Sequence, residues 1–328
     1  MKFRLFALVL FAVLQSCMNN STDTLTGASI DAKLRQTIKS KNDSLLQAMA
    51  LSDNTALKQL GSPDFIKFMH AKLNKQNVLW AFRRGYLDTD NYTVYKEYYN
   101  KHGKAPENTV ITSEEDGYTL SYTNNEKETY ISMLKCTLNG TDQYLVTLMY
   151  GLIDGKWKLN DIEIGCYGTF NRNAAQYYDL AEKAKDKDYI IDAFIYYDLA
   201  NDLLEPAGKM MKYEIADEVE RSTELMLNRI KRRYSFPQVI NSIKSQPSIA
   251  GIAPVRNKKG FYPLINYLTN IPVSDTVALQ NEFRQVKLEA KKIYKGLNFD
   301  TDFLYYRAYN TSTGTHHTFE DFRNKSLN

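Results

Sequence analysis

Apolar residues follow a helical spacing over the first part of the chain. Residues 29–50 carry apolar side chains three or four positions apart, which predicts an amphipathic helix. Residues 53–72 continue this pattern after a break, and Pro63 suits the first turn of the helix that follows. Residues 79–100 are rich in aromatic side chains and favour neither a helix nor a strand. We therefore predict two helical regions, 29–50 and 53–72, and Gly61-Ser62-Pro63 interrupts the second.

The spacing then changes to alternation, which predicts β-strands. The Asn139-Gly140 and Asp154-Gly155 pairs separate three of the alternating runs, and such pairs are strong signals of tight hairpins. We therefore expect a curved antiparallel meander. Its predicted strands are 118–123, 129–138, 143–152 and 157–166.

The predicted meander also indicates whether Cys136 and Cys166 can form a disulfide. The two hairpins place Cys136 and Cys166 opposite nearly the same point of the strand 143–152. Two strand spacings, about 9.5 Å, then separate them. A disulfide needs Cα atoms within roughly 7 Å. We therefore expect two free, buried thiols that act as small core residues.

The stretch YLVTLMYGLIDGKWKLNDIEIG (144–165) resembles the closing hairpin of nuclear-transport-factor-2-like and cystatin-like cone domains. The resemblance implies a cone that often holds a small-molecule cavity, and in some members a catalytic Asp–His or Tyr–Asp pair. The candidates here are His70, Asp161 and Glu163. Asp161 and Glu163 alternate with isoleucines as a solvent-facing edge does, so we expect no catalytic residues.

Residues 174–206 return to a helical period and resemble one tetratricopeptide repeat. A lone repeat cannot bury its core, so it must pack on the cone, on the last domain or on a partner. Two Tyr-Tyr pairs lie in this repeat and are candidate binding residues, although helix packing explains them as well. The repeat positions are Tyr177, Leu180, Ala181, Ala193, Tyr197, Ala200 and Pro206, and the candidate binding residues are Tyr177, Tyr178, Tyr196 and Tyr197.

The remainder of the chain predicts a further helix and an α+β unit. The pattern of residues 208–233 predicts a long helix. Its last turn, Arg229 to Arg233, is basic, which is typical of a solvated helix terminus. The alternative is a site for anionic lipid or for a partner protein. A hairpin, a helix that starts near Asp275, and one strand follow, and the polar tail from Ser312 is expected to be mobile. The hairpin strands are predicted at 248–255 and 260–268, the helix at 275–297 and the last strand at 303–309.

The N-terminus carries a leader. Lys2 and Arg4 precede a ten-residue apolar run, which is too short to cross a bilayer and has the length of a signal-peptide core. Leu14-Gln15-Ser16-Cys17 then resembles the bacterial lipobox. The resemblance implies that Cys17 is acylated and becomes the new N-terminus, and that Met18, which is not aspartate, favours the outer membrane. Residues 17–28 predict a flexible tether.

Composition and motifs exclude several functions. The formal charge of +4 falls to +2 once Lys2 and Arg4 leave with the leader, so no nucleic-acid footprint is present. No phosphate loop, nucleophile elbow or zinc-binding helix motif occurs, and we expect no cofactor. The pair His316-His317 would point to opposite faces of a strand, so we expect no metal site.

Together these patterns predict an α+β protein in five segments. They are a signal peptide (1–16), a lipidated tether (17–28), a cone-like domain (29–170), tetratricopeptide-like helices (171–235) and a C-terminal α+β domain (236–328). The expected function is non-catalytic binding or scaffolding at the outer membrane, with the bilayer and an envelope protein as partners. The alternatives are a small-ligand or glycan binder that uses the cone, and a cone hydrolase or isomerase. The tripeptides at Asp23, Asp43 and Asp275 resemble O-glycosylation sites of exported Bacteroidetes proteins, and only the first is expected to be accessible.

Overall fold

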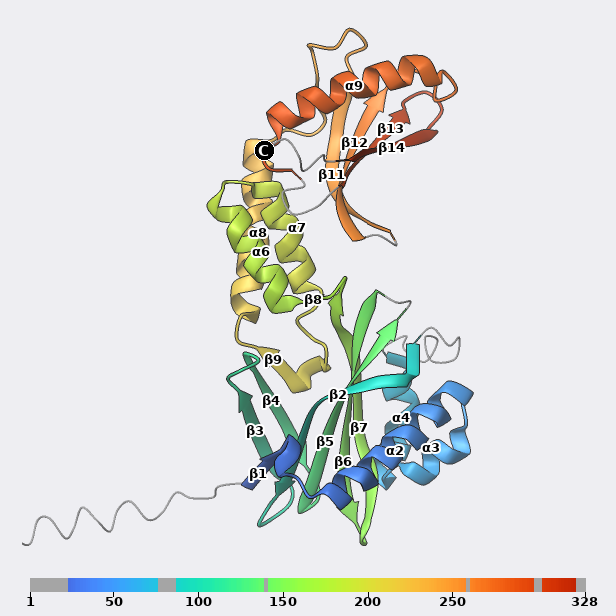
Figure 1. The fold of residues 1–328 in the computed structure, drawn as a ribbon, viewed down its shortest axis with the longest axis vertical. Helices are drawn as coiled ribbons and strands as arrows, with labels where there is room; N and C mark the ends of the chain where they lie inside the picture. The colour runs from blue at the N-terminus through green and yellow to red at the C-terminus, as the bar shows by residue number, and fades with distance from the viewer. Residues whose placement is uncertain (1–22, 76–86, 139–140, 258–259, 298–302, 323–328) are drawn as a thin grey trace, which may run out of the picture.

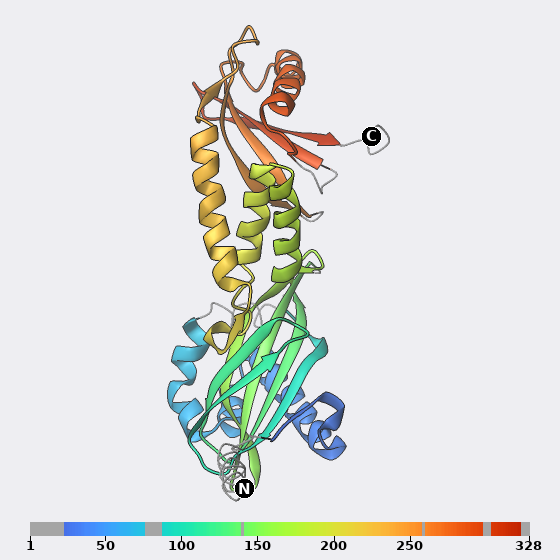
Figure 2. The same cartoon turned by 90° about the vertical axis from the view of Figure 1, so that its left-hand side faces the viewer.

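The computed structural model describes residues 23–75, 87–138, 141–257, 260–297 and 303–322. These residues form an elongated α+β body with seven α-helices and a curled antiparallel sheet, shown in Figures 1 and 2. The leader, Cys17 and residues 18–22 of the predicted tether lie outside the described residues. Among the described residues, no helix is long and apolar enough to cross a bilayer.

The main sheet has six strands in the order β1-β2-β5-β6-β7-β8, and every pair of neighbours is antiparallel. Strand β1 lies in the segment 17–28, which the sequence predicts as a flexible tether. In the structure Asp23 to Thr26 instead pair with the far end of β2. The glycosylation-like tripeptide at Asp23 therefore lies in a strand. The bounds are β1 Asp23–Thr26, β2 Leu87–Lys101, β5 Glu128–Leu138, β6 Asp142–Ile153, β7 Lys156–Thr169 and β8 Arg172–Asn173.

Three helices cover one face of this sheet (Figure 1). They are α2 (Ala32–Leu51), α3 (Asn54–Leu60) and α4 (Pro63–Lys75), and Pro63 opens α4 as the sequence predicts. Their buried side chains form one cluster with apolar residues of β5, β6 and β7, including Leu134, Val146 and Ile162.

A second, three-stranded sheet covers the opposite face. It contains β3 (Glu107–Ser113), β4 (Tyr118–Asn124) and β9 (Met211–Tyr213) in the order β3-β4-β9. The prediction that 118–123 belongs to the meander is therefore wrong, and β2 takes the place beside β5. Two register shifts in β2 interrupt its alternation, which explains why residues 87–101 gave no clear strand signal.

The register confirms the predicted positions of the two cysteines. Cys136 and Cys166 both lie opposite Tyr144, one on each side of β6. Cys136 is buried in the core under the helices, whereas Cys166 is partly exposed and packs against the other core. Both thiols are free.

Three helices follow the main sheet: α6 (Ala174–Asp186), α7 (Ile190–Asn201) and α8 (Ala216–Arg233). The predicted helix from 208 begins only at 216. Residues 208–210 form the short helix η2, after which Met211 and Tyr213 pair with β4 and bury their side chains. The basic end of α8 is solvated as predicted, and at this surface Arg229 and Arg233 form ion pairs with Asp188.

A five-stranded sheet closes the chain in the order β10-β11-β12-β13-β14, with α9 (Thr276–Ile293) on one face (Figure 1). Asp275 caps α9 as predicted, since its side chain accepts a hydrogen bond from the Ala278 N–H at 3.0 Å. The predicted mobile tail instead forms the edge strand β14, where Tyr306 lies opposite the buried Phe319. The strands are β10 Gln238–Val239, β11 Ser248–Asn257, β12 Gly260–Thr269, β13 Phe303–Asn310 and β14 His316–Phe322.

One hydrophobic cluster runs through the whole length of the body. It begins between the six-stranded and the three-stranded sheet, continues through α6, α7 and α8, and ends under α9, with Tyr118, Tyr197 and Tyr267 among its fully buried members. The helical hairpin therefore obtains its core from the sheets on either side of it.

Asn42 provides a fully buried polar link between α2 and the sheet. It is 1 % exposed, its amide donates to Ser132 Oγ, and its Oδ1 accepts from the Tyr150 hydroxyl, both at 2.9 Å. We expect Asn42→Ala to lower the free energy of unfolding by about 2–4 kcal/mol, because two buried hydroxyls lose a partner. Urea denaturation measures this loss. Gln47→Ala, on the exposed side of the same helix, should change stability by less than about 0.5 kcal/mol.

His102 makes stability depend on pH. Its side chain is fully buried, neither ring nitrogen has a hydrogen-bond partner within the described chain, and burial lowers its pKa although Glu107 opposes the shift. The unfolded chain therefore binds this proton more readily, so stability should fall as the pH drops below about 6.5. Denaturation at several pH values should show a shallower decline in His102→Leu. An identical pH profile for both proteins would contradict this reading.

Candidate functional site

The candidate site is a cleft between β2 and the hairpin that joins β3 to β4. Its cavity volume is about 740 Å³, within the range of small-molecule sites. Arg35 of α2 and the end of β1 border it, and Tyr95, Lys96 and Tyr98 of β2 line it together with Ser113 of β3. Behind the cleft lies a cluster that we call the tyrosine network: Tyr95, Tyr98, Tyr118, Tyr167 and Tyr213, with Asp116 and Lys135.

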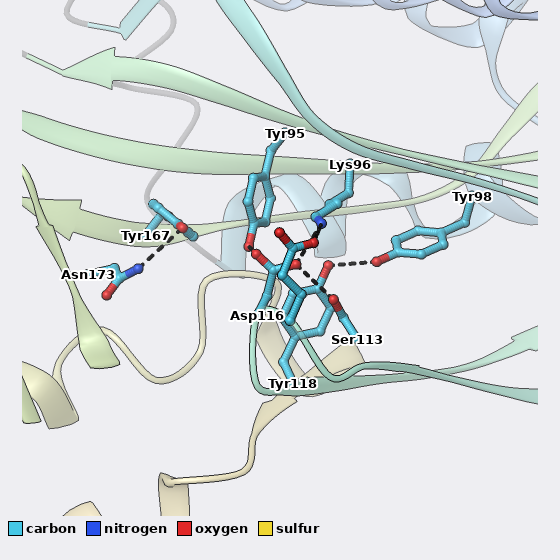
Figure 3. A network of polar contacts seen from close by, with 9 residues as sticks. Tyr95, Lys96, Tyr98, Ser113, Asp116, Tyr118, Tyr167 and Asn173 are labelled. Atoms are coloured by element: carbon cyan, nitrogen blue, oxygen red, sulfur yellow. Dashed lines mark hydrogen bonds and ion pairs between the residues drawn. The ribbon is translucent and has the colours of Figure 1, made fainter. Parts of the chain in front are cut away.

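Asp116, on the β3–β4 turn, joins the network to the wall of the cleft (Figure 3). Its carboxylate accepts hydrogen bonds from the Tyr95 hydroxyl at 2.9 Å and the Ser113 hydroxyl at 2.7 Å, and pairs with Lys96 Nζ at 2.7 Å. Burial alone would raise the pKa of Asp116, but these contacts outweigh it and hold the pKa below its usual value. Asp116 is therefore a carboxylate at neutral pH.

A β-bulge makes this arrangement possible. The register of β2 against β5 shifts between Val94 and Lys96, so Tyr95 has no partner on β5. In a regular strand, neighbouring side chains point to opposite faces. Because of the bulge, the consecutive Tyr95 and Lys96 both reach Asp116.

Side chains fill the space between the main sheet and the three-stranded sheet. The hydroxyls of Tyr98 and Tyr118 lie 2.7 Å apart, and both residues are buried. The ring of Tyr213 meets Tyr118 edge to face, with centroids 6.3 Å apart. Burial is the main cause that raises the pKa values of Tyr118 and Tyr213. These hydroxyls are neutral donors and acceptors at neutral pH.

Lys135 lies between two rings of the network. Its ammonium nitrogen is 3.9 Å from the centroid of Tyr95 and 3.8 Å from that of Tyr167, which is the geometry of a double cation–π contact. Burial would raise the pKa of Tyr167, but contacts with Asn173 and Lys135 outweigh it and lower that pKa. Tyr95, by contrast, has a raised pKa, chiefly because it is buried.

Tyr95 and Asp116 form a Tyr–Asp pair, the type of pair that the family resemblance implies for catalytic members. The sequence analysis did not identify either residue. Asp116 already has three partners, Tyr95, Lys96 and Ser113. The pair therefore braces the hairpin against β2. The open cleft beside it is lined by the half-buried Tyr95 ring and by polar side chains such as Arg35 and Lys96, which suits a polar ligand.

The candidate tyrosines of the helical hairpin lie elsewhere. Tyr177, Tyr196 and Tyr197 are buried and Tyr178 is half-buried. Tyr177 stacks on Tyr196 and Tyr178 packs against Tyr197, with ring centroids 6.3 and 6.0 Å apart. Helix packing therefore accounts for these tyrosines, and the three buried rings present no surface to a partner.

The other candidates are dispersed over the molecule. Asp161 and Glu163 alternate with buried Ile162 and Ile164 as expected, and they line a second cavity. The side chain of His70 lies outside the described residues. The rings of His316 and His317 pack on Tyr309 and Phe319. In the described ranges, no group of three or more His, Cys, Asp or Glu side chains could hold a metal ion.

Comparison with known proteins found no matching family model, no matching curated protein and no matching solved structure.

The contact of Lys135 with Tyr167 can be tested by titration. We expect Tyr167 to ionise at a lower pH than an ordinary tyrosine, and Lys135→Met to move this ionisation to higher pH, because the nearby positive charge is lost. The ultraviolet absorbance of tyrosinate measures both. Lys39→Met is the matched control, because Lys39 also lies over a tyrosine ring, that of Tyr92. A first ionisation that is the same in all three proteins would refute the contact.

Proposed function

We propose that this protein is a lipid-anchored, non-catalytic binding or scaffolding protein of the bacterial outer membrane. The observation that carries the proposal is the shape of the body. The strand β1, where the described chain begins, lies at one end of the long axis, and the five-stranded sheet lies at the other (Figures 1 and 2). An acylated Cys17 would place the first end at the bilayer and direct the second end away from it.

The short link between Cys17 and β1 supports this orientation. Asp23 follows Cys17 by six residues, so an extended link reaches about 20 Å at most. Two or more acyl chains give stable attachment to a bilayer. The body would therefore stay close to the membrane surface, while its distal sheet meets an envelope protein.

The middle helices support a scaffolding role. In this proposal, α6 and α7 are the tetratricopeptide-like unit between a cone-like domain and the C-terminal domain. The inward-facing side chains of α6 and α7 are buried in the continuous hydrophobic cluster. A partner would then meet the outer surface of the distal sheet, where Thr318 of the edge strand β14 is exposed.

The cleft supports a second candidate, a binder of small polar ligands or glycans. The half-buried Tyr95 supplies ring surface, and Arg35 and Lys96 supply hydrogen-bonding groups in a cavity of about 740 Å³. Aromatic rings beside a few polar groups are typical of such sites.

The anchor and the distal contact can be tested together in intact cells. We expect Cys17→Ala to move the protein from the membrane fraction to the aqueous fraction. A photo-crosslinking residue at Thr318 should capture one reproducible envelope protein, and this capture should be lost in the Cys17→Ala background. The matched position is Val110 on β3, which is 65 % exposed and lies on the cone.

The outcomes separate the two parts of the proposal. Membrane association that survives Cys17→Ala would remove the lipid anchor. Capture that is equal at Thr318 and Val110, or absent at both, would remove the distal scaffold and leave the cleft as the binding site.

A further inference from the structure

Strand β14 forms one edge of the five-stranded distal sheet, and its outer side is open to pairing. It pairs with β13 over seven residue pairs without a register shift. A strand that is paired on one side only presents a row of unpaired backbone N–H and C=O groups on the other side. For His316 to Phe319, the described residues provide no second backbone partner. This stretch of β14 therefore offers donors and acceptors to another extended chain.

The other edge strands are shorter or lie in the other half of the body. β1, β8, β9 and β10 have two to four residues each. β3 has seven residues, but it lies in the same half of the body as β1, which the proposed anchor holds near the bilayer (Figure 1). Among the described strands, β14 is therefore the long edge that the proposed orientation directs away from the membrane.

The composition of β14 leaves this edge unprotected. Edge strands are commonly blocked by lysine, by proline or by a β-bulge. His316 to Phe319 contain no lysine and no proline, and the unbroken register excludes a bulge against β13. Asp321 points toward α9, where two lysines contact its carboxylate, so it does not close the edge to a partner.

These two lysines give the edge an excess of positive charge. Lys287 and Lys291 of α9 both pair with Asp321, and Lys291 Nζ lies 3.3 Å from Asp321 Oδ2. The lysine side chains are 32 % and 54 % exposed. Two ammonium groups therefore share one carboxylate, and one positive charge has no counter-charge among the described ion pairs. A carboxylate on a neighbouring strand would complete this cluster.

Neighbouring residues of β14 face opposite sides of the sheet. The ring of His317 lies 4.6 Å from that of Phe319, which stacks on Phe283 of α9. The Thr318 hydroxyl instead accepts a hydrogen bond from Arg307 Nε at 3.2 Å. A partner on one face of the sheet would therefore meet only one of His317 and Thr318. A strand on the edge would lie beside both.

We propose that the distal sheet binds its partner by strand addition: an extended segment with an acidic side chain pairs with β14 as a sixth strand. Backbone hydrogen bonds would hold the segment, and contact with Lys287 and Lys291 would select its acidic residue. A second copy of this edge would bring the same excess of positive charge, so charge favours a different protein. The inference rests on the proposed distal contact and specifies its form.

Mapped photo-crosslinking in intact cells tests the geometry. The full chain carries a photo-crosslinking residue at His316, His317 or Thr318, and mass spectrometry identifies the partner residue that each one reaches. The positions 316 and 318 should reach residues two apart in one segment of one protein, and position 317 should reach the residue between them. Leu288 on α9, which is 60 % exposed, is the control position and should not capture this segment.

The outcomes separate this inference from the scaffold on which it rests. Capture at Thr318 without capture at His317 would leave the distal contact in place and overturn strand addition. Crosslinks to scattered segments, or to another copy of this chain, would also overturn it. Absence of capture at all three positions would remove the distal contact and strand addition together.

A synthetic peptide of the mapped segment tests the charge. The peptide should bind the full chain, and its analogue with glutamine or asparagine in place of each acidic residue should bind at least about threefold more weakly. Lys291→Gln should weaken the native peptide by a similar factor. Lys292→Gln is the matched control, because Lys292 pairs with Glu289 instead of Asp321. Equal affinity of the two peptides, or an equal loss in both variants, would overturn the selection of an acidic segment.

Discussion

The fold depends on covering both faces of the strands β5, β6 and β7. In β5, every residue from Thr129 to Leu134 is buried, so neither face of this strand can be left to solvent. The helices α2, α3 and α4 cover one face, and the small sheet β3-β4-β9 covers the other. Strand β9 comes from a distant part of the sequence, and its pairing with β4 draws η2 and the start of α8 toward the cone. The position of the helices therefore follows from the need to close this sheet.

Polar contacts determine how the two covering layers are placed. Asn42 joins α2 to β5 and β6 inside the apolar core. On the other side, Asp116 and the Tyr98–Tyr118 contact join the β3–β4 hairpin to β2. Apolar packing tolerates small shifts of one layer over another, whereas hydrogen bonds at 2.7 to 2.9 Å between buried groups do not. These few contacts give the cleft a defined width.

Local patterns in the sequence predicted much of the fold. Partly alternating and apolar runs separated by Asn-Gly and Asp-Gly turns predicted β5, β6 and β7, and the register of the cysteines followed from these hairpins. A cap at Asp275 and a helical spacing predicted α9. These features depend on residues close to one another in the chain. The anchor at Cys17 and the proposed functions remain predictions from the sequence.

The errors arose where distant partners decide the structure. Residues 118–123 have a clear strand pattern, but the pattern does not say that the neighbours are β3 and β9. The bulge at Tyr95 hid both the strand β2 and the Tyr95–Asp116 pair, because neighbouring residues on one face violate alternation. The polar segment after Ser312 contains Phe319, whose burial in β14 depends on β13 and α9. Tyrosines of the helical hairpin had two explanations, and only the surrounding core distinguishes them.

The core and the attachment of β1 have a mechanical consequence. Because the same cluster of buried side chains extends from the two facing sheets to α9, the described parts of the body share one apolar core. At the other end of the body, four residue pairs join β1 to β2, so the start of the described chain is part of the main sheet. A displacement of β1 would therefore have to break ladder hydrogen bonds of that sheet.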